Sequence, residues 1–219
     1  MTTGFSFVIA DDHPLFRGAL RQALMGIDDR SRILEVGDFE GTKALIAGSE
    51  EIDLVLLDLS MPGVSGLSGL VALRGMDASL PIVIVSAHDD AATIRRALEL
   101  GASGFISKSS SMDEIRSAVR RVLDGEIARP PGIELGVEGD AEIGDLIARL
   151  RTLTPQQTRV LSMLAEGLLN KQIAFELHVS EATVKAHVSA ILQKLGVDSR
   201  TQAVIRLSRI GTEPLATEG

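Results

Sequence analysis

The sequence predicts an α/β domain with a doubly wound parallel sheet over residues 1–124, followed by a small all-α domain over residues 151–210. Three observations predict this organisation. Five short apolar runs alternate with helical patterns in the first part, which is typical of repeated βα units. The pattern then breaks between residues 125 and 150, where Pro and Gly gather. Four helical patterns follow at short spacing, as in a compact helical domain.

The strands of the first domain are expected at residues 5–10, 32–36, 53–57, 81–85 and 104–106. Within the third of these, the run from Leu54 to Leu57 is continuously apolar and is followed by a loop rich in turn residues, which favours a strand buried on both faces. Helices are expected at 14–25, 39–47, 66–74, 91–100 and 112–124, and Pro14 suits a first helical turn. No Gly-rich phosphate-binding motif follows the first strand, so a dinucleotide site is not indicated.

Residues 125–150 are interpreted as a linker that contains one short helix at 141–150. The helices of the second domain are expected at 155–166, 170–177, 181–195 and 200–209. Thr154 and Ser180 precede two of them with the chemistry of helix starts, and Gly167 and Gly196 stand where two helices should end. Residues 211–219 are expected to form a frayed tail.

The net charge of −8 is unevenly distributed. Residues 151–210 contain eight Lys and Arg against four acids, a net charge of +4, which leaves −12 for the rest of the chain. A basic block of this kind is a possible contact surface for a phosphate backbone. Trp and Tyr are absent, which argues against a protein that stacks single-stranded bases on aromatic rings.

The absence of Cys excludes disulfides, thiol nucleophiles and Cys-rich zinc sites. The four His are scattered and predict no His cluster, so that any metal is expected to be bound by oxygen; they are His13, His88, His178 and His187. No apolar run approaches the length of a membrane span, and the first ten residues lack the pattern of a signal peptide. A cytoplasmic location is therefore expected, without a membrane partner.

Polar residues follow four of the expected strands: Asp11 and Asp12, Asp58, Ser86 and Lys108. Ligands of open α/β sheets bind beyond the carboxyl ends of the strands, so these side chains should converge. Three carboxylates in one crevice suit a divalent cation with oxygen ligands, and Mg²⁺ is the ion expected. Taken singly, a cap at the end of a strand or a surface position is the commoner role for such residues, and their occurrence together at four strand ends favours a site.

This arrangement predicts phosphoryl chemistry. A carboxylate that attacks phosphorus forms an acyl phosphate, for which Asp58 is the candidate nucleophile. Lys108 and Mg²⁺ would stabilise charge on the transferred phosphoryl group, and the Ser86 hydroxyl would hydrogen-bond another of its oxygens.

The first 124 residues resemble the receiver domain of two-component response regulators, whose fold is flavodoxin-like. The residues that carry the resemblance are Asp11-Asp12, Asp58 followed by Met61-Pro62-Gly63 and Gly66, Ser86-Ala87, Gly101-Ala102, and Gly104-Phe105-Ile106-Ser107-Lys108. The resemblance implies that Asp58 is the phospho-acceptor and that Lys108 contacts the phosphoryl group. It also implies that Asp11, Asp12, Asp58 and the Ser60 carbonyl hold Mg²⁺. Ser86 and Phe105 become the switch pair, with Phe in place of the common Tyr.

In the second domain, two helix starts are separated by the residues from Leu177 to Val179, which is the spacing of a helix-turn-helix. The second of these helices has an apolar stripe and an opposite face expected to point outward. The stripe consists of Val184, Val188, Ile191, Leu192 and Leu195, and the outward face of Thr183, Lys185, Ala186 and Ser189. An ordinary helical bundle with a solvated face is the alternative from this pattern alone.

Residues 153–204 resemble the LuxR-type helix-turn-helix of the NarL/FixJ branch. The matching residues are Leu153-Thr154, Val160-Leu161, Gly167, Asn170-Lys171, Ile173-Ala174, Thr183-Val184-Lys185, His187-Val188, Lys194-Leu195, Arg200 and Ala203. The resemblance implies that Lys185, Ala186 and Ser189 face the major groove of DNA. It implies phosphate contacts by Asn170, Lys171, Thr183, His187 and Lys194, and a homodimer helix that includes Arg200, Ala203, Val204 and Leu207. Gln156-Gln157 stand where the family often has Arg-Glu.

Together these features predict a DNA-binding response regulator whose transcriptional activity is controlled by phosphorylation at Asp58. The implied partners are a sensor histidine kinase, double-stranded operator DNA, a second copy of the chain and RNA polymerase. Two alternatives remain. A phosphatase of the haloacid-dehalogenase type would need a second Asp at position 60, where the chain has Ser60. An atypical regulator would bind DNA without phosphorylation.

Overall fold

The computed structural model describes residues 4–48, 51–64, 66–133 and 141–209. The chain forms two compact units, one with all the strands and one with the helices from residue 141 onward, and residues 71–78 are grouped with the second unit. Residues 134–140 of the expected linker and the expected tail at 211–219 lie outside the described residues.

The first unit is built on a five-stranded parallel sheet with the strand order β2-β1-β3-β4-β5. The strands are β1 (Ser6–Ala10), β2 (Arg32–Val36), β3 (Leu54–Asp58), β4 (Ile82–Ser86) and β5 (Gly104–Ser107). The order reverses between β1 and β3, which makes the sheet doubly wound and confirms the predicted fold class. Asp58 and Ser86 are the last residues of their strands, one position earlier relative to the strand end than the sequence predicted.

Five helices connect the strands: α1 (Pro14–Met25), α2 (Phe39–Ala47), α3 (Ser68–Met76), α4 (Ala91–Glu99) and α5 (Met112–Leu123). Local chemistry explains several of their starts. Pro14 occupies the first turn of α1, where its missing N–H costs nothing. Asp38 and Asp90 cap α2 and α4 through their carboxylates, and Ser111 and Glu114 form a capping box at α5. The third helix begins two residues later than predicted, at Ser68.

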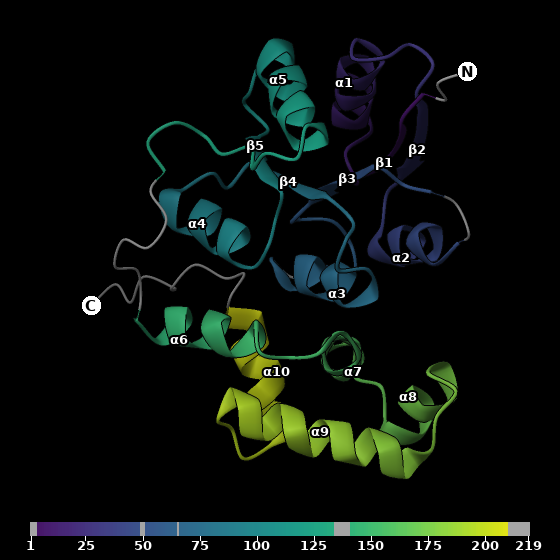
Figure 1. Cartoon of the computed structure of the whole chain (residues 1–219), viewed down its shortest axis with the longest axis vertical. Coiled ribbons are helices and arrows are strands. Elements are labelled where there is room, and N and C mark those ends of the chain that lie inside the picture. Colours follow the sequence, from purple (N-terminus) through teal and green to yellow (C-terminus); the bar gives the residue numbers. More distant parts are fainter. Residues whose placement is uncertain (1–3, 49–50, 65, 134–140, 210–219) are drawn as a thin grey trace. The chain divides into compact units, whose positions relative to one another are not determined.

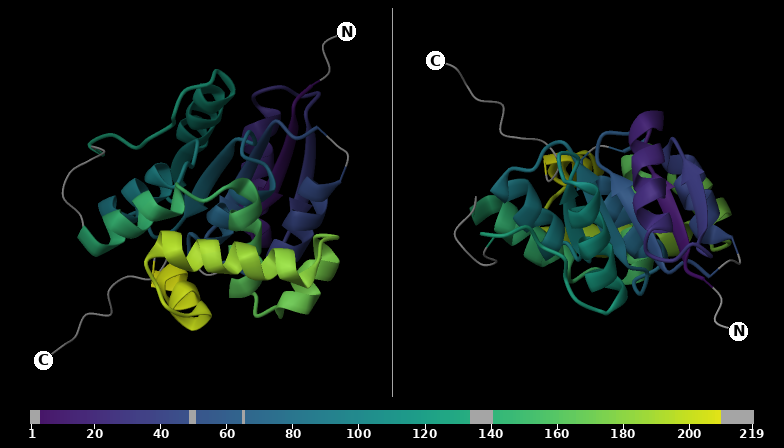
Figure 2. Two further views of the ribbon diagram at one scale, coloured as in Figure 1. Left: turned by 60° about the horizontal axis from the view of Figure 1, so that its bottom comes forward. Right: turned by 90° about the horizontal axis from the view of Figure 1, so that it is seen from above.

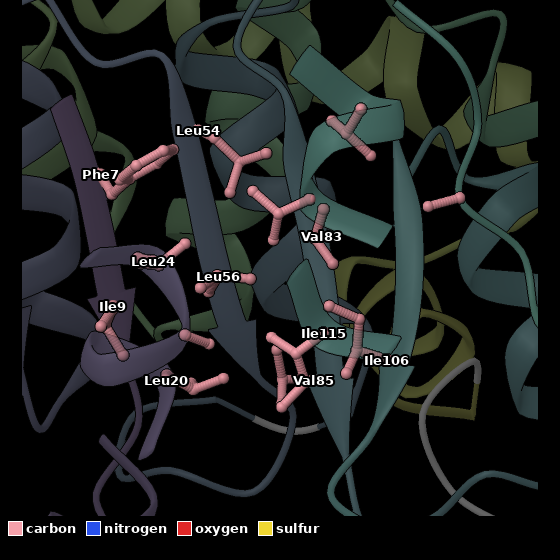
Figure 3. Close-up of a cluster of buried hydrophobic side chains, with 14 residues drawn as sticks. Phe7, Ile9, Leu20, Leu24, Leu54, Leu56, Val83, Val85, Ile106 and Ile115 are labelled. Atoms are coloured by element: carbon pink, nitrogen blue, oxygen red, sulfur yellow. The ribbon is translucent and has the colours of Figure 1, made fainter. Parts of the chain in front are cut away.

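The helices cover both faces of the sheet (Figure 1). Helices α1 and α5 lie side by side on one face, as Figure 2 also shows, and α2, α3 and α4 lie on the other. Figure 3 shows the core under α1 and α5, where side chains from alternate strand positions meet the helices. The labelled members are Phe7, Ile9, Leu20, Leu24, Leu54, Leu56, Val83, Val85, Ile106 and Ile115. Burial of such side chains stabilises the unit by about 1.5–3 kcal/mol each.

The chain that leaves α5 is paired with the edge of the sheet. The Ala128 N–H donates to the Ser103 carbonyl at 3.0 Å, and the Phe105 N–H donates to the Ala128 carbonyl at 2.9 Å. Gly104 allows this approach, because a Cβ at that position would lie 2.9 Å from both Ala128 Cβ and its carbonyl oxygen. Arg121 Nη2 donates to the Ile127 carbonyl at 3.0 Å. The expected linker therefore begins with a segment that is hydrogen-bonded to β5.

The second unit is helical, as predicted. Its helices are α6 (Ala141–Leu150), α7 (Pro155–Ala165), α8 (Asn170–Glu176), α9 (Glu181–Leu195) and α10 (Arg200–Arg209). Helix α9 is the longest and contacts α6, α7, α8 and α10. Gln157 completes a capping box with Thr154, so Gln serves the capping role at this departure from the family pattern. None of the helices that the structure describes is long and apolar enough to cross a membrane.

Candidate functional site

Three acidic side chains meet at the carboxyl ends of β1 and β3. Asp11 follows β1 and Asp58 ends β3, and each is only 1% exposed. Asp12 is adjacent to Asp11, and its side chain is about one-third exposed at 32%. The strand order places β1 and β3 as neighbours, which explains why residues 47 positions apart in sequence share one pocket. The predicted convergence of these carboxylates is present in the structure.

Lys108 reaches into this acidic pocket from the end of β5. Its Nζ lies 2.8 Å from Asp58 Oδ2 and 2.8 Å from Asp11 Oδ2. Partial burial alone would lower the pKa of Lys108, but the hydrogen bonds and charges of Asp11 and Asp58 outweigh it and raise the pKa above its usual value. The ammonium group therefore stays charged at neutral pH, where it can contact an anion.

His13 also belongs to the pocket, although no sequence pattern distinguishes it from the other three His. Its Nδ1 lies 2.7 Å from Asp12 Oδ1 and 3.2 Å from Asp11 Oδ1. The same nitrogen is 3.4 Å from Lys108 Nζ and 3.9 Å from Asp58 Oδ2. The imidazole of His13 is therefore a member of the pocket that the sequence analysis did not select.

The acidic pocket has the donor set of a divalent-cation site. One ligand atom each from Asp11, Asp12, His13 and Asp58 falls within 4.8 Å of the others. Asp11 Oδ2 and Asp12 Oδ1 are buried and accept no hydrogen bond among the described residues, although each lies at ion-pair distance from a neighbouring side chain. Buried carboxylate oxygens in this state fit a hard cation, which prefers oxygen ligands. Ser60, the fourth predicted ligand, is adjacent, since its N–H donates to Asp58 Oδ1 at 3.2 Å.

Of the two expected switch residues, Ser86 ends β4 and Phe105 lies within β5. Ser86 is fully buried, and its Oγ accepts the His88 N–H at 3.0 Å, within its own loop. The Ser86 carbonyl accepts the Lys108 N–H at 2.8 Å. This bond joins the backbone of Lys108, the residue expected to contact the phosphoryl group, to the end of β4. Phe105 is 2% exposed, so its ring points into the protein. Because Ser86 Oγ is the acceptor in its bond with the His88 N–H, the hydroxyl proton takes no part in that bond and can be donated to a group in the pocket.

In the helical unit, α8 and α9 form a helix-turn-helix. His178 takes a left-handed conformation with φ +51° in the turn between them, a conformation in which His is enriched among residues other than Gly. Ser180 caps α9 by accepting the Thr183 N–H at 3.1 Å. The side chains of α9 that are buried are those of Val184, Ile191 and Leu195, which belong to its predicted apolar stripe.

The outward face of α9 is as predicted. Thr183, Lys185, Ala186 and Ser189 are all exposed. The Lys185 ammonium pairs with Glu181, one turn earlier, at 3.1 Å. A pair this exposed contributes at most about 1 kcal/mol to stability, so Lys185 is readily available to another acceptor.

The other expected DNA contacts differ in their surroundings. Lys171 is exposed, and Asn170 and His187 are half-buried. Lys194 Nζ already donates to the Thr152 carbonyl at 2.7 Å and to Gln157 Oε1 at 2.8 Å. Because an ammonium group has three donors, one remains for a phosphate.

Part of the expected dimer helix α10 packs against the other helices of its own unit. Ala203 and Leu207 are buried, and Arg200 Nη2 donates to the Leu168 carbonyl at 2.6 Å. Val204 is half-buried, and Ile205 is 50% exposed. Ala203, Leu207 and Arg200 therefore support the helix from within, and Ile205, which the sequence analysis did not select, is the apolar residue of α10 open to a partner.

Comparison with known proteins agrees with these two units. A family model described as a response regulator receiver domain matches residues 7–120, and one described as bacterial regulatory proteins of the luxR family matches residues 151–207. The glycerol metabolism activator of Pseudomonas putida is 41% identical over 207 residues, covering 92% of this chain and 94% of that protein. The nitrate/nitrite response regulator NarP of Escherichia coli is 37% identical over 205 residues, covering 93% and 94%.

Solved structures of the same architecture include the RcsB response regulator of Salmonella typhimurium. One such structure has a TM-score of 0.55 and 23% identity, and it covers 95% of this chain and 100% of that chain. Another shows RcsB bound to a promoter in the presence of a phosphomimetic, with a TM-score of 0.55 and 23% identity, covering 94% and 99%. At this identity the likeness supports the fold alone.

Proposed function

Because the chain belongs to the response-regulator family, with a receiver domain and a LuxR-family domain, it is a DNA-binding transcription regulator, and we propose that Asp58 is its phospho-acceptor. The proposal rests on one observation above all. Asp58 is buried at the end of β3, with the Lys108 ammonium 2.8 Å from its Oδ2. A carboxylate nucleophile beside a fixed cation is the arrangement that phosphoryl transfer needs.

The reaction is a displacement at phosphorus. An Asp58 carboxylate oxygen forms a bond to phosphorus as the bond to the donor breaks, and the leaving group is the imidazole of a histidine kinase or the carboxylate of an acyl phosphate. Lys108 contacts an oxygen of the transferred group. Asp11, Asp12, Asp58 and the Ser60 carbonyl are the proposed Mg²⁺ ligands, and Mg²⁺ supplies charge neutralisation when it is bound.

Phosphorylation is proposed to act as a population shift. The phosphoryl group gives the proton of the buried Ser86 hydroxyl an acceptor, and this new bond is compatible with the one that Ser86 Oγ accepts from the His88 N–H. Phe105, inward in this structure, is the proposed second member of the switch. Coupling between sites in proteins is typically about 1–3 kcal/mol, and the phosphoryl group must favour the active receiver by an amount of this order.

The output is proposed to be a homodimer on double-stranded operator DNA. The exposed face of α9 carries the proposed groove contacts Lys185, Ala186 and Ser189. Asn170, Lys171, Thr183, His187 and Lys194 are the proposed phosphate contacts. The DNA complex of RcsB supports this proposal by analogy of fold. A sensor kinase and RNA polymerase are the further proposed partners, and the role is regulatory rather than enzymatic, as in the named relatives.

The proposal is tested by measuring the mass and DNA affinity of the full chain with and without Mg²⁺ and beryllofluoride, a phosphoryl mimic. Wild-type protein should dimerise and bind DNA more tightly with the mimic, whereas Asp58→Ala should not respond. DNA binding that is strong and indifferent to the mimic would favour the atypical regulator and reject Asp58 as the switch. Phosphodonor-dependent labelling of Asp58→Ala would also reject it.

A further inference from the structure

A carboxylate outside the acidic pocket holds the turn that carries Lys108. Asp89 lies in the loop between β4 and α4, and Ser107 is the last residue of β5. The Ser107 Oγ donates to Asp89 Oδ2 at 2.6 Å across 18 residues of sequence. This distance lies within the range of hydroxyl-to-carboxylate hydrogen bonds, which are about twice as strong as bonds between neutral groups.

The same hydroxyl organises the residues on both sides of Lys108. The Ser109 N–H donates to Ser107 Oγ at 3.2 Å, and the two Oγ atoms are 2.7 Å apart. Because the single Ser107 hydroxyl proton goes to Asp89, the Ser109 hydroxyl is the donor between the two serines. The Ser110 N–H closes the turn on the Ser107 carbonyl at 3.0 Å. Ser107 Oγ thus joins Ser107 and Ser109, the two neighbours of Lys108, and the same oxygen is hydrogen-bonded to Asp89.

This support gains importance during phosphoryl transfer. In the present structure the Lys108 ammonium is fixed by ion pairs with Asp11 and Asp58. When an oxygen of Asp58 bonds to phosphorus, that carboxylate loses its charge and the ion pair with it. The Ser107–Asp89 bond involves neither reacting group and can persist through the step.

We propose that Asp89 is a positioning residue for phosphoryl transfer, acting through Ser107 to hold Lys108 where it meets the transferred phosphoryl group. The inference rests on the proposed role of Asp58. Misplacement of a charged group by about 1 Å can reduce a rate by about 100-fold. Lys108 keeps its backbone bond to the Ser86 carbonyl, so the expected loss on removing Asp89 is smaller, about 3–10-fold.

The test follows phosphorylation of the full chain by acetyl phosphate and Mg²⁺ on phosphate-affinity gels. Asp89→Ala and Ser107→Ala should each slow the initial rate about 3–10-fold, and the double variant should be no slower than either single variant, since both remove one bond. Asp89→Asn should restore most of the rate, because its amide oxygen still accepts from Ser107. Asp90→Ala, which changes the adjacent residue and removes a cap of α4, should match the wild type in rate.

A readout besides rate separates positioning from general damage to the fold. The affinity for Mg²⁺, measured by calorimetry, should be unchanged in Asp89→Ala, because the proposed ligands lie at the carboxyl ends of β1 and β3. A parallel loss of Mg²⁺ affinity and rate, or a rate equal to that of the wild type, would overturn the inference. The Asp58→Ala variant separates the two proposals. Labelling of Asp58→Ala rejects the phospho-acceptor, and with it the role of Asp89, whereas labelling confined to proteins with Asp58 and indifferent to Asp89 rejects Asp89 alone.

Discussion

The Lys108 ammonium nitrogen lies 2.8 Å from Asp58 Oδ2 and equally close to Asp11 Oδ2, although β5 and β1 are not adjacent in the sheet. Both carboxylates are almost completely buried. Two buried negative charges repel each other, and the lysine ammonium offsets this repulsion and donates a hydrogen bond to Asp58 Oδ2. The pocket is therefore an ion cluster in which each charge depends on the others.

Replacing Lys108 with Met should destabilise the first unit, which contains the five-stranded sheet and is called the sheet unit below, when Mg²⁺ is absent. Removing one partner of a buried ion pair costs about 3–5 kcal/mol, because the remaining charge is left uncompensated. Mg²⁺ should restore much of this stability, since it supplies positive charge to the same carboxylates. The measurement is urea unfolding followed by far-UV circular dichroism, with and without Mg²⁺, as the chain has no Trp or Tyr for fluorescence.

Lys185→Met serves as the control for that experiment. Its ion pair with Glu181 is exposed on both sides, and its loss should change the free energy of unfolding by less than about 1 kcal/mol, with no response to Mg²⁺. Equal stability of the Lys108→Met variant and the wild type in the absence of Mg²⁺ would show that Asp11 and Asp58 do not need this lysine.

Gly104→Ala should destabilise the sheet unit by about 1–3 kcal/mol. Its new Cβ would lie 2.9 Å from Ala128 Cβ and from the Ala128 carbonyl oxygen, so that the bridge to β5 must open or shift. Hydrogen exchange of the Phe105 amide, which donates to Ala128, should become faster. Gly18→Ala in α1 is the matched control, because nothing lies within 4 Å of its Cβ and Ala favours a helix by about 1 kcal/mol. Similar stability changes in the two variants would contradict a steric role for Gly104.

Asp90→Ala should lower the stability of the sheet unit by about 1 kcal/mol at pH 7, because Asp90 caps α4. Partial burial raises the pKa of the Asp90 carboxyl, but its hydrogen bonds with Thr93 and Ala92 outweigh this and the pKa lies below its usual value. A lowered pKa means that the stabilisation is present above the unfolded pKa of about 4 and is lost as the pH falls through the folded pKa. The difference between Asp90→Ala and wild type should therefore shrink in acid. Asp90→Ser has a neutral cap, so a pH-dependent difference between the Ser and Ala variants would argue against the carboxylate as the cause.

Lys185→Ala should weaken binding to an operator selected from random DNA. If Lys185 contacts a base edge, the loss should be about 1–3 kcal/mol at one position of the site and specificity there should relax. If it contacts a phosphate, affinity should fall uniformly and the slope of log affinity against log salt should decrease by about 1. Unchanged affinity would reject α9 as the recognition helix.

Glu181→Gln is the companion variant for the DNA measurement. It removes the carboxylate that pairs with Lys185 at 3.1 Å and leaves the lysine in place. Loss of a negative charge near the phosphates should raise affinity for all sequences, opposite in sign to the lysine variant. A loss of affinity would instead indicate that Glu181 itself contacts DNA.

Much of the fold followed from the sequence because its signals are local. The apolar runs located all five strands to within one residue at each end. Asp11, Asp58 and Lys108 lie together because parallel strands end at the same edge of the sheet. Caps such as Ser180 marked helix starts in the same local way.

The remaining features depend on contacts that no local pattern reports. His13 lies in the turn after β1, and this turn places its Nδ1 beside Asp12 in the acidic pocket. The Asp89–Ser107 bond joins the loop after β4 to the last residue of β5, 18 residues further along the chain. In α10 the pattern could not tell which apolar residues face their own unit, and Ala203 is buried whereas Ile205 is half-exposed.

The hydrogen bonds of Ala128 with the edge of the sheet also determine where the chain can be truncated to give an isolated sheet unit. Strand β5 is an edge strand, and Ala128 covers its Ser103 carbonyl and Phe105 N–H. A fragment ended at Asp124, after α5, would leave these groups open to pairing with another chain, and such edges invite aggregation. A fragment that runs through Pro131 keeps the edge covered. The chain beyond the last helix of this unit thus protects the sheet from self-association.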